Sequence, residues 1–106
     1  MAPYELRWAK VAFEDNPTES KWRPVLIVED RYYLIYALKV TSHPPREKFW
    51  GEYEIKRWRD AGLTEASTIR ISQFLELAPE DIGEKIGDLH TVDILTVENY
   101  IERLYG

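Results

Sequence analysis

Cations and hydroxyl groups occur together at the ends of apolar runs in this sequence. Each of three runs carries such residues: Arg23 before the first, Lys39 and Thr41 at the end of the second, and Thr68, Arg70 and Ser72 along the third. Guanidinium groups bind two phosphate oxygens at once, and hydroxyls add neutral hydrogen bonds. If the three runs converge, this pattern predicts a phosphate-binding site. The alternative is that Arg23 and Arg70 are solvated charges that pair with surface carboxylates.

Five strands are expected to position these residues. Apolar alternation or continuous apolar runs predict strands over residues 8–13, 24–29, 32–41, 49–55 and 67–77. Residues 56–63 have the pattern of one helical turn closed by Gly62. Strands followed by helical segments predict a mostly β fold with α additions, in which a small, strongly bent sheet or barrel carries helices on its outside.

Two helical patterns follow Pro79. Residues 79–87 form a short pattern that glycines interrupt, and residues 91–106 form a longer one. The longer pattern places four apolar side chains on one stripe: Ile94, Val97, Ile101 and Leu104. Thr91 is a candidate N-cap, and Gly106 lies past the helix end. This last helix is therefore expected to pack its stripe against the sheet.

The composition limits the classes of protein and site. With 106 residues, the chain is expected to form one domain, residues 1–106. It has no cysteine, which excludes disulfide scaffolds, thiolate zinc sites and a cysteine nucleophile, and no cofactor or metal is expected. No apolar run is long enough to span a membrane, so we expect a cytoplasmic protein. The net charge of −5 disfavours nonspecific binding to nucleic acid, so any RNA contact depends on a local basic site.

Four segments resemble, in the same order, segments of one bacterial family. They are KWRPVLIV (21–28), LKVTS (38–42), GLTEASTIRIS (62–72) and EDIGEKIGDLHTVDI (80–94). The set resembles the MazF/PemK family of toxins from type II toxin–antitoxin modules. The resemblance implies an SH3-like small barrel of the MazF/PemK/CcdB type with a C-terminal helix, usually as a homodimer. It also implies a cognate antitoxin whose acidic C-terminal segment lies across the RNA groove.

The activity that the resemblance implies is that of a sequence-preferring, metal-independent endoribonuclease acting on single-stranded RNA. The 2′-hydroxyl of the RNA is the nucleophile, and cleavage leaves a 2′,3′-cyclic phosphate and a 5′-hydroxyl. Such a reaction needs a base, an acid and positive charge on the phosphorane, but no protein nucleophile and no metal. It therefore suits a chain without cysteine.

The resemblance also assigns roles to individual residues. Four match catalytic positions of the family: Arg23, Thr41, Ser42 and Arg70. Pro24 fixes the backbone angle φ beside Arg23, which would hold the arginine in one direction. Five further residues are expected to bind RNA: Lys21, Trp22, Lys39, Thr68 and Ser72. Trp22 could stack on a base, and burial in the core is the alternative for this aromatic residue.

The general base is not assigned by the sequence. Some relatives carry an Asp where this chain has Ser72, and some carry a His in the first loop. That loop here offers only three carboxylates: Glu14, Asp15 and Glu19. Glu19 is a candidate base because the charge of Arg23 would keep it ionised, and His43 is another because imidazole titrates near neutrality. The alternative for both is a solvated loop position, and His90 is expected to be structural.

Two other functions remain open from the sequence. One is a non-catalytic toxin, because gyrase-poisoning toxins share this fold and fold does not determine function. Those toxins depend on C-terminal residues that commonly include a Trp, whereas this chain ends in ERLYG. The other is a binding module that has lost catalysis, which the acidic balance and the missing Asp and His would fit.

Overall fold

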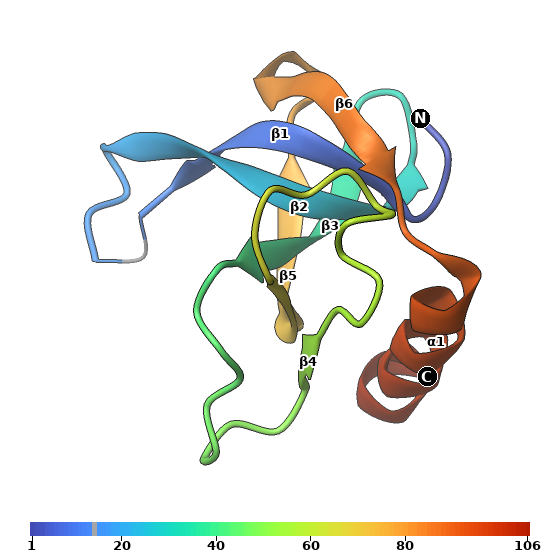
Figure 1. Ribbon diagram of the computed structural model, residues 1–106. Coiled ribbons are helices and arrows are strands. Elements are labelled where there is room, and N and C mark those ends of the chain that lie inside the picture. Colours follow the sequence, from blue (N-terminus) through green and yellow to red (C-terminus); the bar gives the residue numbers. More distant parts are fainter. Residues whose placement is uncertain (14) are drawn as a thin grey trace.

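The computed structural model describes residues 1–13 and 15–106, which form one antiparallel sheet and a helix (Figure 1). The strands are β1 (Glu5–Ala12), β2 (Ser20–Asp30), β3 (Ile35–Thr41), β4 (Glu52–Glu54), β5 (Thr68–Leu77) and β6 (Ile82–Asp88). A 3₁₀ helix, η1 (Pro79–Asp81), precedes β6, and α1 (Thr91–Tyr105) follows it. The order of the strands in the sheet is β4-β5-β3-β2-β1-β6. The predicted mostly β fold with a C-terminal helix is confirmed.

Apolar side chains pack on both faces of this sheet. Leu26 belongs to the core cluster on one face, whereas Val25 and Ile27 belong to the cluster on the other. The Leu26 cluster also contains Val97 of α1, so the helix packs against that face. This two-sided burial explains why residues 25–28 form a continuous apolar run. Each fully buried Leu or Ile side chain contributes about 1.5–3 kcal/mol to stability.

Two strands begin later than the sequence pattern predicts. β3 begins at Ile35 and not at residue 32, because Tyr32 has a φ of 67° in the turn after β2. β4 begins at Glu52 and not at residue 49, because Gly51 has a φ of 91°. A positive φ interrupts a strand. β3 still ends at Thr41 as predicted, whereas β4 ends one residue early at Glu54. β1 and β2 begin earlier than predicted, at Glu5 and Ser20.

The helix predicted over residues 79–87 is wrong. One 3₁₀ turn is followed by β6, which pairs with β1. The glycines serve close packing in this strand, because a Cβ at Gly87 would lie 2.1 Å from the Ala61 carbonyl oxygen. A side chain there would collide with the neighbouring segment, so the glycines that interrupted the helical pattern belong to a strand.

The C-terminal helix is confirmed, but its N-cap is His90 and not Thr91. The Nδ1 atom of His90 accepts a hydrogen bond from the Val92 backbone N–H at 3.1 Å, which gives His90 a structural role.

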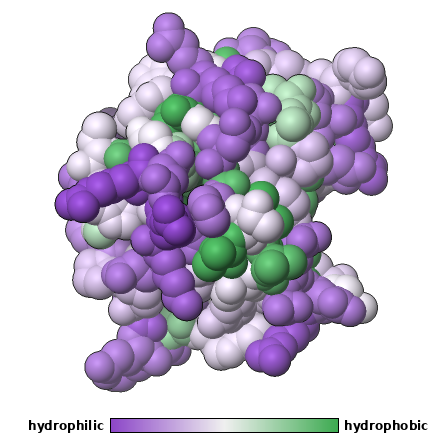
Figure 2. Space-filling view, turned by 45° about the vertical axis from the view of Figure 1, so that its right-hand side comes forward, coloured by the Kyte–Doolittle hydropathy of each residue, from purple (hydrophilic) through white to green (hydrophobic). Residues whose placement is uncertain are grey.

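Figure 2 shows the molecule from the side on which α1 lies, where small hydrophobic areas are scattered among hydrophilic ones. On this helix Val92 and Leu95 are exposed. Within the described part of the chain, no helix is long and apolar enough to cross a membrane.

Candidate functional site

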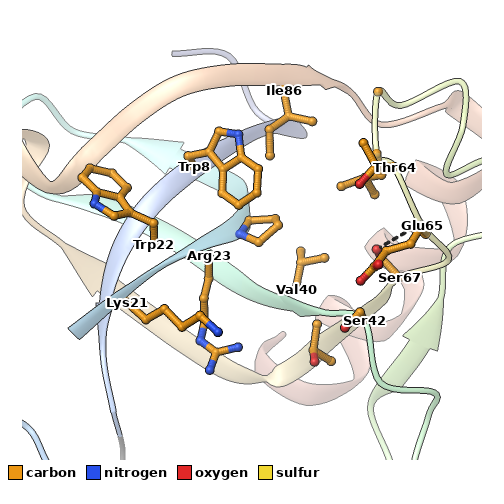
Figure 3. A pocket seen from close by; sticks show the side chains of 14 residues that line it. Trp8, Lys21, Trp22, Arg23, Val40, Ser42, Thr64, Glu65, Ser67 and Ile86 are labelled. Carbon is orange, nitrogen blue, oxygen red and sulfur yellow. Dashed lines mark hydrogen bonds between the residues drawn. The ribbon is translucent and has the colours of Figure 1, made fainter. Parts of the chain in front are cut away.

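A pocket of about 420 Å³ opens beside the point where β3 ends (Figure 3). Its walls come from β1, β2, the end of β3, β6 and the segment 62–67. The segment 62–67 runs between β4 and β5 and crosses in front of the sheet in Figure 1. The pocket therefore gathers residues that are far apart in the sequence.

The pocket lies where β2 and β3 separate, because the last two residues of β3 pair with β5 and not with β2. The ladder between these strands begins at Val25 and Lys39, whereas the β1–β2 ladder continues as far as Ala12 and Ser20. Residues 20–24 of β2 are therefore paired on the β1 side only. This gap lets side chains from both faces of β2 reach one pocket.

The two faces of β2 contribute different chemistry to the pocket. Lys21 and Arg23 extend to one side of the strand, whereas Trp22 lies on the other side with Trp8 (Figure 3). This arrangement follows from strand alternation. One side therefore offers positive charge, and the other offers two aromatic rings, of which Trp8 is 43% and Trp22 51% exposed.

Arg23 has an aromatic neighbour and forms no ion pair with a carboxylate in the described part of the chain. Its guanidinium carbon lies 5.9 Å from the centre of the Phe13 ring. No carboxylate among residues 1–13 and 15–106 forms an ion pair with Arg23 or Lys21. Two cations without a described acidic partner make this side of the pocket suited to an anionic group.

Hydroxyl groups lie at the end of β3 in the same pocket. Thr41 is buried, and its Oγ1 accepts a hydrogen bond from the His43 backbone N–H at 3.3 Å. Ser42, the next residue, is exposed and also lines the pocket. The structure therefore brings together three of the residues matched to catalytic positions: Arg23, Thr41 and Ser42.

Arg70 does not line this pocket but faces a carboxylate. It lies opposite Lys39 on β3 and opposite Glu52 on β4, and its Nε is 3.6 Å from Glu52 Oε2. Glu52 is buried and also accepts hydrogen bonds from the backbone N–H and the guanidinium of Arg46. The hydrogen bonds from Arg46 hold the pKa of Glu52 below its usual value, against the effect of burial. Arg70 is thus part of an ion-pair group at the β4–β5 edge.

The remaining predicted residues lie in different surroundings. Thr68 is buried, and its Oγ1 has no hydrogen-bond partner among the described residues. Ser72 is exposed and lies against Gly51. Glu19 and His43 are exposed and do not line the pocket, so the geometry does not single out either candidate base. Glu14 lies outside the described residues.

One wall of the pocket is not indicated by the sequence pattern, and it contains Thr64, Glu65 and Ser67. This segment has no regular pattern, and only its fixation by distant residues brings it to the site. Asp93 of α1, fully buried, accepts hydrogen bonds from the backbone N–H groups of Lys56 at 2.9 Å and the next residue at 3.0 Å. The Tyr53 hydroxyl donates to the same carboxylate, and burial together with this hydrogen bond raises the pKa of Tyr53 to about 12.

A close backbone contact fixes the far end of the wall. Gly62 has a φ of 89°, and a Cβ at this position would lie 2.4 Å from the Ile86 carbonyl oxygen. Only glycine allows the segment to lie so near β6 in this conformation. The wall is therefore fastened to α1 before Gly62 and to β6 at Gly62. Across the residues that the structure describes, no three His, Asp or Glu side chains are grouped so as to hold a metal ion.

The fold is similar to that of solved bacterial toxins. A structure described as an endoribonuclease in complex with its cognate antitoxin from Mycobacterial species has a TM-score of 0.77 at 9% identity, covering 97% of this chain and 92% of that chain. The Mycobacterium tuberculosis toxin MazF-mt6 has a TM-score of 0.72 at 18% identity, covering 96% and 94%. A MazE–MazF structure from Deinococcus radiodurans has a TM-score of 0.68 at 14% identity, covering 98% and 91%.

At the level of sequence, a search of curated proteins found no significant match. A family profile does match, over residues 3–105 and thus over nearly all of the chain. Its description is PemK-like, MazF-like toxin of type II toxin-antitoxin system. The chain therefore belongs to the PemK/MazF family of toxins.

Proposed function

We propose that this toxin is a sequence-preferring, metal-independent endoribonuclease that cleaves single-stranded RNA, and that it acts in the cytoplasm. The observation that carries the proposal is the meeting of Arg23 with the Thr41 and Ser42 hydroxyls in one open pocket. Two structural neighbours, described as endoribonucleases, support the same activity. The pocket provides cations and hydrogen-bond donors, which are the groups that a phosphorane needs.

In the proposed reaction, the 2′-oxygen of one nucleotide attacks the adjacent phosphorus while the bond to the 5′-oxygen of the next nucleotide breaks. A base takes the 2′ proton, and an acid gives a proton to the leaving 5′-oxygen. Arg23 stabilises the charge on the equatorial oxygens, and the Thr41 or Ser42 hydroxyl donates to the same oxygens. The products are a 2′,3′-cyclic phosphate and a 5′-hydroxyl. Glu19 and His43 remain the candidates for the base.

The proposal includes two protein partners. A cognate antitoxin with an acidic C-terminal segment would compete with RNA for Lys21 and Arg23, and an acidic segment that folds on binding can cover a long groove. The Deinococcus radiodurans neighbour, described as MazE–MazF, supports a partner of this kind. A second copy of the chain, forming a homodimer, is the other partner.

The test is an incubation of a defined single-stranded RNA with the protein in excess EDTA. Denaturing gels should show discrete fragments, and a polynucleotide kinase should label their new 5′ ends without prior phosphatase treatment. Intact RNA with folded protein in excess would contradict the proposal, and inhibition of DNA gyrase by the same preparation would then favour a non-catalytic toxin. Cleavage that EDTA abolishes would indicate a metal-dependent nuclease instead.

A further inference from the structure

We propose that Glu65 selects guanine at a nucleotide that flanks the scissile phosphate. The inference rests on the proposed function, because it assigns a role in RNA recognition to the wall opposite the aromatic residues. Glu65 is the one carboxylate among the described residues that line the pocket. It lines the same pocket as Arg23 and Thr41, which are the residues proposed to hold the phosphate.

The pocket has apolar surfaces against which a base can pack. Trp8, Pro24, Val40, Leu63 and Ile86 provide its apolar surfaces. Aromatic side chains bind bases by stacking, and such stacking is tolerant of the identity of the base. Discrimination must therefore come from polar groups at the edge of the ring. Those of the segment 64–67 are available for this role, because the cations and the hydroxyls at the end of β3 are assigned to the phosphate.

Glu65 is attached to a backbone that the structure fixes. The Ser67 hydroxyl donates a hydrogen bond to the Glu65 carbonyl oxygen at 2.9 Å, as the dashed line in Figure 3 marks. The Leu63 N–H donates to the Trp58 carbonyl at 3.1 Å, and Gly62 lies against Ile86. The backbone that carries the exposed Glu65 is therefore preorganised, which limits the freedom that this segment loses on binding.

The chemistry of a carboxylate favours guanine among the four bases. An ionised carboxylate only accepts hydrogen bonds, and its two oxygens can receive two parallel donors. Guanine offers such a pair, the N1–H and one N–H of the 2-amino group. Adenine and cytosine offer one amino group beside an acceptor nitrogen, and uracil offers one N–H between two carbonyl oxygens that repel the carboxylate. The expected order is therefore guanine first and uracil last.

The experiment compares wild type, Glu65→Gln and Glu84→Gln on a pool of random single-stranded RNA, with cleavage positions read by sequencing. Glu84 is an exposed carboxylate of β6 outside the pocket, so its variant controls for the loss of charge. Wild type and Glu84→Gln should prefer guanine at one flanking position, by roughly 5- to 150-fold over uracil, and Glu65→Gln should lose most of this preference. Replacing that guanine by inosine, which lacks the 2-amino group, should weaken cleavage by wild type but not by Glu65→Gln.

A binding assay separates this inference from the proposed function. It uses oligonucleotides in which 2′-deoxynucleotides prevent cleavage and a single position carries each base in turn. Cleavage with a preference that Glu65→Gln does not change would overturn the role of Glu65 and leave the nuclease proposal standing. Guanine-selective binding that depends on Glu65, in a protein that cleaves no RNA, would overturn the nuclease proposal alone. Neither cleavage nor binding would overturn both.

Discussion

Arg70 and Glu52 face each other across β5 and β4, with 3.6 Å between Arg70 Nε and Glu52 Oε2. The carboxylate is buried and is also bound by Arg46. Of the two arginines that the sequence matches to catalytic positions, Arg23 therefore lines the pocket and Arg70 belongs to a group of charges at the sheet edge. The two should behave differently when they are replaced.

Arg70→Ala is expected to affect stability more than catalysis. Removing the guanidinium takes one cation from a buried carboxylate, which should lower the free energy of unfolding by about 1–3 kcal/mol. The cleavage rate of the folded variant should fall by less than the roughly 100-fold that loss of a phosphorane-stabilising donor costs. Urea denaturation and single-turnover cleavage measure the two effects. A larger loss of rate in a protein of normal stability would place Arg70 at the phosphate.

Glu52 should make stability depend on pH. The Arg46 hydrogen bond lowers the pKa of Glu52 from its ordinary value of 4.5, although burial opposes the shift. A lowered folded-state pKa means that the contribution is fully present above about pH 4.5 and is lost as the pH falls through the folded-state value. Glu52→Gln should therefore cost about 1–3 kcal/mol at pH 7, and the difference from wild type should shrink below pH 4.5.

The control for this measurement is Glu54→Gln. Glu54 lies on the same strand but is exposed, and no ion pair is recorded for it in the described part of the chain. Its variant should follow the wild-type curve at every pH. Equal curves for both variants would show that the Glu52 pair contributes nothing.

Asp93 should connect the stability of α1 to activity at the pocket. Asp93→Asn exchanges one acceptor oxygen for a donor against the N–H groups of Lys56 and Arg57, which should cost about 1–3 kcal/mol. Since the same segment continues into the pocket wall, cleavage by the folded variant should also fall. Glu102→Gln, at an exposed position of α1, is the matched control. Normal cleavage by a destabilised Asp93→Asn protein would show that the wall does not need this anchor.

RNA and antitoxin should compete for the same cations. Arg23→Glu should weaken the binding of a non-cleavable RNA and of the acidic antitoxin segment together, because both would lose one attraction and gain one repulsion. Arg59→Glu, an exposed change outside the pocket, controls for net charge. If Arg23→Glu weakened RNA binding but left the antitoxin affinity unchanged, the antitoxin would act from another surface. Titrations followed by fluorescence anisotropy distinguish these outcomes.

The strands and the final helix could be predicted because their patterns are local. Alternation along residues 67–77 and the apolar stripe of residues 91–106 depend on neighbours in the sequence, and both elements form. The segment 79–87 is wrongly predicted to be helical. Its glycine at position 87 allows a close contact with Ala61, and no local pattern indicates this contact. The turn at Tyr32, where φ is positive, is also not indicated by any local pattern.

In the candidate site, too, some residues could be placed from local patterns and others depend on distant contacts. Thr41 could be placed at a strand end from the sequence, whereas Arg23 lies within β2, which begins at Ser20 and not at residue 24 as predicted. The early end of the β2–β3 ladder brings Arg23 and Thr41 to one pocket. Arg70 is kept out of the pocket group by its ion pair with Glu52. Glu52 belongs to another strand, and the register of β4 with β5 places it opposite Arg70. The position of Glu65 depends on a segment whose conformation is fixed by the hydrogen bonds to Asp93 and by the close contact of Gly62 with β6. Neither contact can be read from the local sequence.

Arg23 is proposed to stabilise the charge of the phosphorane. The measurement that tests it is single-turnover cleavage of one defined single-stranded RNA in EDTA by wild type, Arg23→Ala and the control Arg59→Ala. Folding of each variant is checked by circular dichroism. Arg59→Ala should cleave at nearly the wild-type rate, whereas Arg23→Ala should lose roughly two to three orders of magnitude in rate while remaining folded. Cleavage at nearly the wild-type rate by folded Arg23→Ala protein would remove Arg23 from the mechanism.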